Sequence, residues 1–369
     1  MVAIPTVVDT TLQAADAALE ANARKSRPRP YIGMSAIGRP CDRALWYGFR
    51  WAKQPDFDAA TLKRFDDGHR GEDLQAERLR MVSTIELLTV DPTTGQQFAY
   101  VDHGGHFRGH CDGLISGLIQ APRTRHVWEH KQTADKKQAQ LNKSVIDHGE
   151  KGALAAWDET YYAQAQLYMA YSGTDRHYLT CSSPGGRHTV SVRTDLNTTD
   201  AERYRDRALR IIQSHEPPPR LSEKPEFYIC KWCEFSDICH SDELPAPNCR
   251  SCCHATPELD GDGRWSCAHW CDDIPREHQS NGCINHVYLP ALINYAVALA
   301  SDPEHNLVRY KTNDGREFTT GTKPCVYSPD APHYTSVELH ALDPKLISDQ
   351  RIELIRNEFG ATIAKDASA

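Results

Sequence analysis

Two runs of alternating hydrophobic and polar residues lie near the middle of the chain. The first is HFRGHCDGLI, which ends at Ile115, and the second is HVWEHKQT, which ends at Thr133. A period of two residues is the pattern of a β-strand. The short connector between the runs contains Pro122 and suits a turn between antiparallel strands. The stretch from Gly109 to Thr133 therefore predicts a β-hairpin.

Helical spacing of apolar residues surrounds this hairpin. Asp9 or Thr10 can cap the first helix, Ser35 can cap the second, and Gly173 ends the fourth. A pair of strands, 176–183 and 187–194, is joined by a PGG turn, and an NDG turn marks another hairpin at 309–320. The order of elements predicts an α/β protein. The predicted helices span 8–24, 35–51, 60–82, 158–173, 200–214, 289–300 and 345–364.

Composition narrows the setting of the protein. Hydrophobic residues make up 40% of the 369, enough for a normal core, and no run approaches the roughly 18 apolar residues that span a bilayer. The first residues, MVAIPTVVDTTLQAAD, are acidic and lack the apolar segment of a signal peptide. We therefore expect a cytoplasmic protein without a membrane partner. In a reducing compartment, 13 cysteines favour metal ligation over disulfides.

The net charge of −8 gives no support to a general nucleic-acid coat. Local charge differs, because the segment from Arg123 to Lys143 holds six Lys or Arg residues against Glu129 and Asp135. An acidic protein with a local basic groove can still bind DNA.

The predicted hairpin concentrates chemistry at one place. Glu129 and Lys131 share one face of their strand, whereas Trp128 and His130 point the other way. With Asp112 from the preceding run, two carboxylates and one ammonium converge. Carboxylates are suitable ligands for Mg²⁺ or Mn²⁺, and a lysine can orient or deprotonate a metal-bound water. Such a combination can hydrolyse a phosphodiester. The alternative is an ordinary charged hairpin.

Two predicted helices carry further candidates. His69 and Glu72 are three residues apart on one helix, so His69 becomes a third metal ligand if that helix lies against the hairpin, and its nitrogen favours Mn²⁺. Otherwise His69 is simply solvated. Gln164 and Tyr168 share a face of another helix. The alternative is that Tyr168 is a core residue and Gln164 is incidental.

Three cysteines follow the α/β segment in a C-x2-C-x5-C array, at Cys230, Cys233 and Cys239. Three thiolates make an incomplete tetrahedral site, and Cys41 is the obvious fourth ligand, although an isolated cysteine is often only a small buried side chain. Both zinc and an iron–sulfur cluster accept four thiolates.

These motifs together resemble the RecB-like branch of the PD-(D/E)XK nucleases, which has a helical histidine, an aspartate, an ExK strand and then QxxxY. The resemblance implies a restriction-endonuclease-like core, a mixed sheet flanked by helices. It implies Mg²⁺ or Mn²⁺ ligands at His69, Asp112, Glu129 and the main-chain carbonyl of His130, a catalytic Lys131, and Gln164 and Tyr168 positioning the lysine and the DNA. The sequence departs from the pattern at Asp112, which no proline precedes.

The resemblance covers residues 31 to 241 and extends to the cysteines. CRISPR-associated and AddB-like members of the branch place one cysteine before the core and three after it. This layout implies a [4Fe–4S] cluster held by Cys41, Cys230, Cys233 and Cys239, which would tie the N-terminal helix to the end of the core. We favour iron–sulfur over zinc here on the spacing and the family.

Residues 245–290 hold six cysteines and four histidines. We expect one structural Zn²⁺ in a zinc-ribbon-like module, because a short polar segment cannot otherwise bury a core. Arg250, Arg264 and Trp265 are candidates to contact a phosphate backbone or stack a base, or are exposed for solubility. The expected zinc ligands are Cys249, Cys252, Cys267 and Cys283, with His254, Cys271 and His286 as competing ligands and Cys253 merely adjacent.

The sequence thus predicts three units: a nuclease domain at 1–244, the zinc module at 245–290, and a small α+β extension at 291–369. The favoured function is a metal-dependent DNA exonuclease acting on single strands or duplex ends in recombination, repair or replication, with recombination or replication proteins as further partners. Its small appendages fit a phage or mobile-element protein. The alternatives are a non-catalytic DNA-binding scaffold of nuclease fold and a structure-specific endonuclease.

Overall fold

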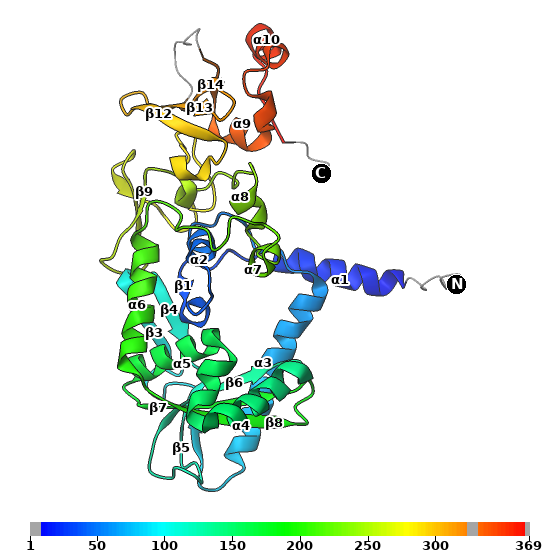
Figure 1. Cartoon of the computed structure of the whole chain (residues 1–369), viewed down its shortest axis with the longest axis vertical. Coiled ribbons are helices and arrows are strands. Elements are labelled where there is room, and N and C mark those ends of the chain that lie inside the picture. The colour runs from blue at the N-terminus through cyan, green and yellow to red at the C-terminus, as the bar shows by residue number, and fades with distance from the viewer. Residues whose placement is uncertain (1–8, 323–330, 366–369) are drawn as a thin grey trace.

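The computed structural model describes residues 9–322 and 331–365, which form a mixed α/β protein with several sheets (Figure 1). The N-terminal half contains α1 (Thr10–Ala23), β1 (Ile32–Gly33), the 3₁₀ turn η1 (Met34–Ala36), α2 (Asp42–Phe49), α3 (Ala59–Arg80), β2 (Glu86–Leu88), β3 (Ala99–Asp102), η2 (His103–Gly105), β4 (Phe107–His110), β5 (Gly113–Ser116), β6 (His126–Gln132), α4 (Asp135–Trp157) and α5 (Glu159–Ser172).

The C-terminal half continues from there. It contains β7 (Arg176–Ser182), β8 (Thr189–Asp195), α6 (Thr198–Gln213), α7 (Tyr228–Lys231), α8 (Ser236–His240), η3 (Cys249–Ser251), β9 (Ala255–Pro257), β10 (Trp265–Cys267), β11 (Asp272–Asp273), η4 (Pro290–Leu292), β12 (Ala296–Asp302), β13 (Leu307–Thr312), β14 (Glu317–Gly321), β15 (His333–Tyr334), α9 (Ser336–Ala341), η5 (Pro344–Leu346) and α10 (Gln350–Phe359).

The main sheet has the order β2-β5-β6-β7-β8. The predicted hairpin is confirmed for β5 and β6, which pair antiparallel with Gly113 opposite Trp128, and β6 then pairs parallel with β7. The run predicted as its first strand is split at Cys111 and Asp112, so that β4 belongs to a second sheet and only β5 to this one. Helix α3 covers one face of this sheet, where Ala76 packs with Trp128 and Tyr178. Helices α4 and α5 cover the other face. The sheet is therefore enclosed between helices, and β6 runs through its middle.

Helix α5 begins and ends at residues suited to those positions. The side chain of Asp158 accepts a hydrogen bond from the backbone N–H of Thr160 at 2.9 Å, which caps the helix. The helix ends at Gly173, whose φ of 68° is in the left-handed region that glycine occupies at little cost. The predicted helix at 158–173 is confirmed, and its caps fix which side chains face β6.

A smaller sheet, β1-β4-β3, adjoins α5. Its residue Tyr100 lies 5.6 Å from Tyr168 of α5, measured between ring centroids. Along β4 the burial alternates: Phe107 and Gly109 face the core, and Arg108 and His110 are on the other face. Strand β4 ends two residues before Asp112, so this sheet feeds directly into the predicted site.

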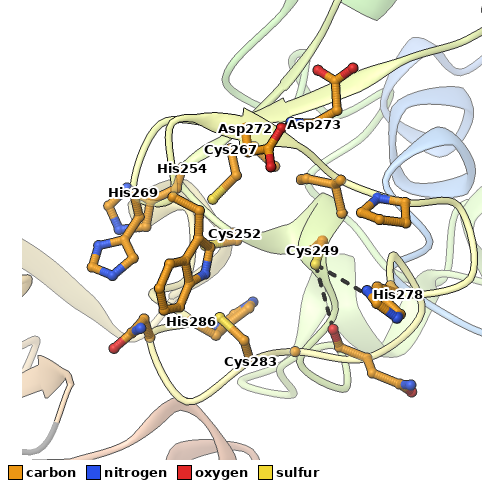
Figure 2. Close-up of a pocket in the computed structure, with 17 residues that line it drawn as sticks. Cys249, Cys252, His254, Cys267, His269, Asp272, Asp273, His278, Cys283 and His286 are labelled. Carbon is orange, nitrogen blue, oxygen red and sulfur yellow. Dashed lines mark hydrogen bonds between the residues drawn. The ribbon is translucent and has the colours of Figure 1, made fainter.

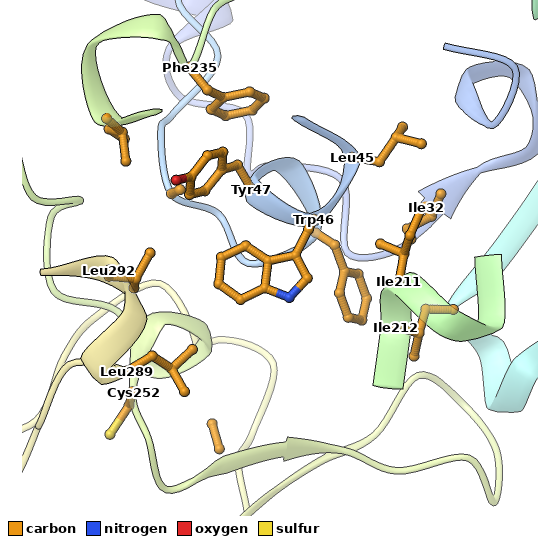
Figure 3. Close-up of a cluster of buried hydrophobic side chains, with 14 of the residues drawn as sticks. Ile32, Leu45, Trp46, Tyr47, Ile211, Ile212, Phe235, Cys252, Leu289 and Leu292 are labelled. Atoms are coloured by element: carbon orange, nitrogen blue, oxygen red, sulfur yellow. The ribbon is translucent and has the colours of Figure 1, made fainter. Parts of the chain in front are cut away.

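Helix α2 lies in the centre of the hydrophobic core (Figure 3). Trp46 and Tyr47 are buried, and Phe235, Ile211 of α6 and Leu289 lie around them in different directions. One buried cluster therefore runs from α2 into the segment after residue 245 and onward to Ile347. The core is continuous across the predicted boundary at residues 244 and 245.

The link between α2 and the cysteine-rich segment is a stack of aromatic rings and guanidinium groups, which we call the arginine–tryptophan stack. It consists of Trp46, Trp51, Trp265, Arg50 and Arg250. The Cζ of Arg50 lies 5.4 Å from the ring centroid of Trp46 and 5.1 Å from that of Trp265. The Cζ of Arg250 lies 4.7 Å from Trp265 and 3.8 Å from Trp51. Both arginines are 1% exposed.

The C-terminal segment differs most from the expectation. The predicted helix at 289–300 is wrong: Pro290 opens a 3₁₀ turn, and Ala296–Asp302 forms the edge strand β12 of a four-stranded sheet. Pairing with β13 overrides the helix preference of its alanines and leucine. Beyond Ala296 every residue of β12 is exposed.

Smaller differences concern helix ends. Ser35 does not cap a long helix, because residues 34–36 form a 3₁₀ turn and α2 starts after Cys41. The last helix is shorter than expected and ends at Gly360, whose φ is 61°. In the part of the chain that the structure describes, none of the helices combines the length and apolar character needed to cross a membrane.

Candidate active site and cysteine centres

The carboxylates of Asp112 and Glu129 and the ammonium of Lys131 meet at the centre of the main sheet. The Nζ of Lys131 lies 2.7 Å from Oε2 of Glu129 and 3.8 Å from Oδ2 of Asp112. Glu129 is 1% exposed and Asp112 is 8% exposed. Strand β6 places Glu129 and Lys131 on one face, as the alternation predicts. The structure thus brings these three residues together.

Backbone hydrogen bonds fix both carboxylates. The N–H of His130 donates to Oδ2 of Asp112 at 2.8 Å, and the N–H of Asp112 donates to Oε1 of Glu129 at 3.2 Å. The main chain beside Glu129 therefore holds the carboxylate of Asp112, and the main chain of Asp112 holds the carboxylate of Glu129. This arrangement orients the carboxylates before any ligand arrives.

Helix α5 supports the site from one side. The Nε2 of Gln164 donates to Oε2 of Glu129 at 3.0 Å, so the glutamine contacts the acid directly. Tyr168 is 1% exposed, and burial followed by the negative charge of Glu129 raises its pKa. The structure places both predicted α5 residues beside Glu129, with Gln164 in contact and Tyr168 buried below.

The side chain of His130 lies on the opposite face of β6. Its Nδ1 is 3.0 Å from the hydroxyl of Thr180 and its Nε2 is 3.0 Å from the hydroxyl of Ser182. Burial, and next the charge of Lys131, lowers its pKa to about 4, so the imidazole is neutral near pH 7. Both ring nitrogens are occupied, and only the main chain of His130 faces the predicted metal site.

Helix α3 brings Glu72, not His69, to the site. Gly71 lets the helix approach β6, because a Cβ at that position would lie 2.1 Å from Oε1 of Gln132. Burial and the charge of Asp112 raise the pKa of Glu72 to about 7, while Lys131 opposes that shift. His69 is exposed, and among the described residues no hydrogen bond or ion pair joins it to the carboxylates.

The site holds more negative than positive charge. Asp112 and Glu129 pair with a single cation, Lys131, and the charges of Asp112 and Lys131 also act on Glu72 nearby. Burial and the charge of Asp112 raise the pKa of Glu129, although Lys131 offsets part of the effect. Burial alone would lower the pKa of Lys131, but Glu129 and Asp112 together raise it. Clustered carboxylate oxygens with an unbalanced charge fit a divalent cation of the Mg²⁺ or Mn²⁺ type.

The four cysteines of the predicted iron–sulfur set line one small cavity. Cys41 directly precedes α2, and Cys230 is on α7. Cys233 precedes α8, and Cys239 lies in that helix. Burial, and then the charges of Cys41 and Cys239, raise the pKa of Cys230, since like charges lie close together. The donor set fits a thiolate-bound metal. The free space between these residues is about 20 Å³. A four-iron cluster is larger than a single metal ion, so the four thiols would have to lie farther apart to hold the cluster than to hold one ion.

The cysteine-rich segment encloses a larger cavity of about 520 Å³ (Figure 2). Cys249, Cys252, Cys267 and Cys283 all line it. Burial, and then the charges of the other three cysteines, raise the pKa of Cys249 to about 12. Short strands β9, β10 and β11 form an antiparallel sheet beneath it. The four thiols predicted for zinc therefore share one cavity.

Competing ligands also occur around this cavity. The ligand atoms of Cys252, Cys253 and His254 lie within 4.8 Å of one another. The Nε2 of His286 is 3.1 Å from the hydroxyl of Ser251, and Cys271 is exposed with its thiol near Ala268 O. Cys252 belongs to both sets, so an ion held by the four cysteines excludes one held by Cys252, Cys253 and His254. Among the described residues, only the latter set has its ligand atoms within 4.8 Å of one another.

Two expectations for this segment are wrong. Arg250 is 1% exposed and Trp265 is 0% exposed, so neither can contact a phosphate backbone, stack a base or add solubility. They form the arginine–tryptophan stack instead, because neighbouring rings of α2 cover them. Arg264 pairs with Asp260 and Asp273, which neutralises its charge.

Glu72 is the site residue that motif matching misses. The sequence contains one signal for it, since it follows His69 by three residues on the same helix. Three residues turn a helix by about 300° and advance it by about 4.5 Å. Which of the two reaches the site depends on how α3 sits against the sheet, and the pattern of charges along the helix does not fix that.

Comparisons with known proteins give weak likenesses. A scan against family models found no match, and neither did a search of curated proteins. Among solved structures, SSO0001 is 15% identical, with 63% of this chain and 96% of that chain covered and a TM-score of 0.33. An alkaline exonuclease from Laribacter hongkongensis is 13% identical, with 53% of this chain and 90% of that chain covered and a TM-score of 0.35.

A phage-related exonuclease from Haemophilus somnus is 10% identical over 51% of this chain and 94% of that chain, with a TM-score of 0.25. At these scores the likeness does not establish a shared fold. The function of this protein is therefore argued from its own site.

Proposed function

We propose that the protein is a nuclease that hydrolyses DNA phosphodiesters with the help of a divalent metal ion. The observation that carries the proposal is the packing of Asp112, directly before β5, and Glu129 of β6 around Lys131, with Gln164 bonded to Glu129. Ordinary charged hairpins keep such groups in solvent, where ion pairs contribute little. Burying several acids around one lysine costs free energy, and a catalytic role explains why the chain retains them.

Asp112, Glu129 and the main-chain carbonyl of His130 would hold the ion, with a further ligand from α3. Because Glu72 faces the site and His69 is exposed, we expect Glu72 to serve there, and His69 remains a prediction that paired substitutions test. When bound, Mg²⁺ or Mn²⁺ would supply Lewis-acid stabilisation of the phosphoryl oxygens.

The chain's own groups supply the remaining functions. The ammonium of Lys131 is 20% exposed, so it can reach a substrate from its bonded position and donate to a phosphate oxygen or orient the attacking water. Gln164 keeps Glu129 in place, and the backbone N–H of His130 does the same for Asp112. We infer exonuclease action on single strands or duplex ends from the resemblance to the RecB-like branch.

Cys41, Cys230, Cys233 and Cys239 are proposed to hold a [4Fe–4S] cluster, with zinc as the alternative metal. The shared cavity and the family spacing support four thiolate ligands. Anaerobically purified protein should be brown and contain about four irons per chain. Cys41→Ser should bleach it as fully as Cys233→Ser. Colourless protein with zinc at this site would reverse the choice of metal.

The cysteine-rich segment is proposed to bind one structural Zn²⁺ through Cys249, Cys252, Cys267 and Cys283. Structural zinc sites are closed by four protein ligands, which agrees with four thiols around one cavity. Metal analysis of Cys283→Ser against Cys253→Ser separates this set from the set of Cys252, Cys253 and His254. Loss of zinc in the Cys253 variant alone would favour the latter.

The experiment that tests the function is direct. Purified protein is incubated with end-labelled single-stranded and duplex DNA in the presence of Mn²⁺ or Mg²⁺, and again with EDTA. We expect metal-dependent shortening of the strand from its end. No cleavage by wild-type protein with full metal content would contradict the proposal and favour a binding protein of this fold.

A further inference from the structure

Two cavities on the N-terminal side of the molecule meet at one aromatic ring. One, of about 390 Å³, is lined by Arg27, Arg29 and Tyr31, among others. The second, of about 310 Å³, is lined by Tyr31, Arg108 and Arg276. Tyr31 belongs to both and is partly exposed. The ring of Tyr31 therefore lies between two adjoining cavities, which together we call the depression.

Unneutralised positive charge gathers along this depression. Among the described residues, Arg27, Arg29, Arg108 and Arg276 make no ion pair with a carboxylate, and all but Arg108 are exposed. The other cations of the first cavity are paired: Arg24 with Asp56, Arg39 with Glu234 and Lys53 with Asp237. Asp262 also lines the second cavity, where Arg264 and Asp273 neutralise each other. In a chain of net charge −8, such a surplus of cations favours an anionic ligand.

The ring of Tyr31 adds a second kind of contact. The Cζ of Arg29 lies 5.6 Å from its centroid and that of Arg108 lies 5.7 Å from it. Both guanidinium groups lie over this partly exposed ring and form a cationic aromatic surface of the kind that single-stranded nucleic acids bind, with phosphates on the cations and a base stacked on the ring or on a guanidinium plane. Only an unpaired base presents a free face for stacking, so a duplex would lose this contact.

Arg108 of the depression lies four residues before Asp112 in the chain. Gly33, two residues after Tyr31, pairs with Arg108 in the small sheet, and His110 lies on the same exposed face of β4 as Arg108. Asp112 follows two residues later. Four residues of extended chain span about 13 Å, a distance that a few nucleotides bridge.

We propose that this depression is the entry track of a single DNA strand, held by Arg27, Arg29, Arg108 and Arg276 and by stacking of one base on Tyr31. The track rests on the proposed nuclease function, because it names the strand that the carboxylate site receives. Arg276 comes from the cysteine-rich segment, so that segment supplies one side of the track.

The test measures binding without cleavage. Fluorescence anisotropy of a labelled mixed-sequence oligonucleotide is followed in EDTA at several salt concentrations. Tyr31→Leu should weaken binding by about 5- to 100-fold, the equivalent of one lost base stack. Arg29→Gln combined with Arg276→Gln should reduce the slope of log affinity against log salt by about 1.4, since each phosphate contact on a single strand contributes about 0.7.

Two controls accompany these variants. Tyr31→Phe keeps the ring and should bind like the wild type. Arg187→Gln with Arg210→Gln removes the same charge from exposed arginines that also lack ion pairs, and should leave both affinity and slope unchanged. Equal loss in the control pair, an unchanged salt slope in the Arg29 and Arg276 pair, or wild-type affinity in Tyr31→Leu would overturn the track.

Duplex DNA and cleavage complete the test. If Tyr31→Leu weakens a blunt duplex as much as a single strand, the assignment to a single strand is overturned. Wild-type cleavage with unaffected binding in the track variants overturns the track and leaves the nuclease function standing. Tyr31-dependent binding without cleavage by any preparation supports the track and removes the proposed function.

Discussion

The carboxylate site and the arginine–tryptophan stack both bury charge, but they balance it differently. At the stack, Arg50 donates to the carbonyl oxygens of Ser214 and Arg250 at 3.2 Å, and Arg250 donates to those of Pro30 and Phe49 at 3.0 Å. Neither guanidinium has a carboxylate partner among the described residues, and both lie against aromatic rings. At the site, three acids share one lysine.

The difference separates structural from functional burial of charge. Carbonyl oxygens and ring faces contact both guanidinium groups of the stack, although Nε of Arg50 and Nε1 of Trp265 are buried without a hydrogen-bond partner among the described residues. At the carboxylate site, burial and the charge of Asp112 raise the pKa of Glu72 and of Glu129, and a bound divalent cation would relieve the repulsion between these acids. Substitutions at the site and at the stack test this contrast.

The largest effect is expected at Lys131. Lys131→Ala should lower the rate of Mn²⁺-dependent cleavage by about 10²- to 10⁴-fold, the usual contribution of a positioned acid–base group. Asp112→Ala should abolish cleavage, because it removes a metal ligand. The measurement is single-turnover release from end-labelled DNA, with Lys311→Ala as an exposed control on β13. Full cleavage activity in the Lys131 variant would contradict the assignment of the active site.

Arg250→Met should destabilise the fold without entering the chemistry. Methionine retains much of the volume but leaves the carbonyls of Pro30 and Phe49 without their donor, at a cost of about 3 kcal/mol. The midpoint of urea unfolding measures this loss. Arg351→Met, at a side chain 87% exposed, should shift the free energy of unfolding by less than about 0.5 kcal/mol. Equal midpoints would mean that the stack contributes nothing.

Glu72 and His69, both on α3, are the two candidates for the additional metal ligand. Glu72→Gln should lower Mn²⁺-dependent cleavage by about 10- to 100-fold, as loss of a group that supports a metal site does. His69→Gln should leave the rate close to that of the wild type, because the imidazole is exposed. The reverse order of effects would restore His69 as the ligand.

The smallest effect concerns His106, which lies 5.9 Å from Trp265 at the edge of the stack. Burial, with the charges of Arg250 and Arg108 adding to it, lowers its pKa from 6.5 to about 4. Between pH 6.5 and pH 4 the imidazole of His106 is protonated in the unfolded chain but neutral in the folded chain. The free energy of unfolding therefore falls as the pH drops through this range.

For His106 the loss between pH 7 and pH 5 is about 2 kcal/mol. His106→Gln keeps a donor for the carbonyl of Glu258, which His106 Nε2 contacts at 2.9 Å, but does not titrate. The variant should therefore lose less stability than the wild type over the same pH range in urea unfolding. Parallel pH profiles would show that other groups cause the acid sensitivity.

Local signals in the sequence predicted the elements that carry the site. The alternation around Glu129 gave the β6 strand and its faces, and the Asp158 and Gly173 caps gave α5. Such features depend on neighbours within a few residues, so they can be read without knowing the fold. Asp112, Glu129, Lys131 and Gln164 meet because those elements pack in the order that the resemblance implied.

Features that depend on distant partners could not be predicted in this way. β12 is a strand because β13 pairs with it, although alanine and leucine favour a helix. Arg250 and Trp265 looked like surface residues of a polar segment, and only the rings of α2, two hundred residues earlier, make them buried. The rotation of α3, which selects Glu72 over His69, is likewise set by packing against the sheet.

The hydrogen bond between Arg50 and the main chain of Arg250 can form only after the ribosome has added the residues that separate them. The two residues are separated by 200 positions. At a ribosome rate of about 5–20 residues per second, α2 waits roughly 10–40 s before its partners exist. During that interval Trp46 and Phe49 lack the cover that residues 250–292 later provide. Slower translation between these points would lengthen the time in which the unfinished chain can aggregate.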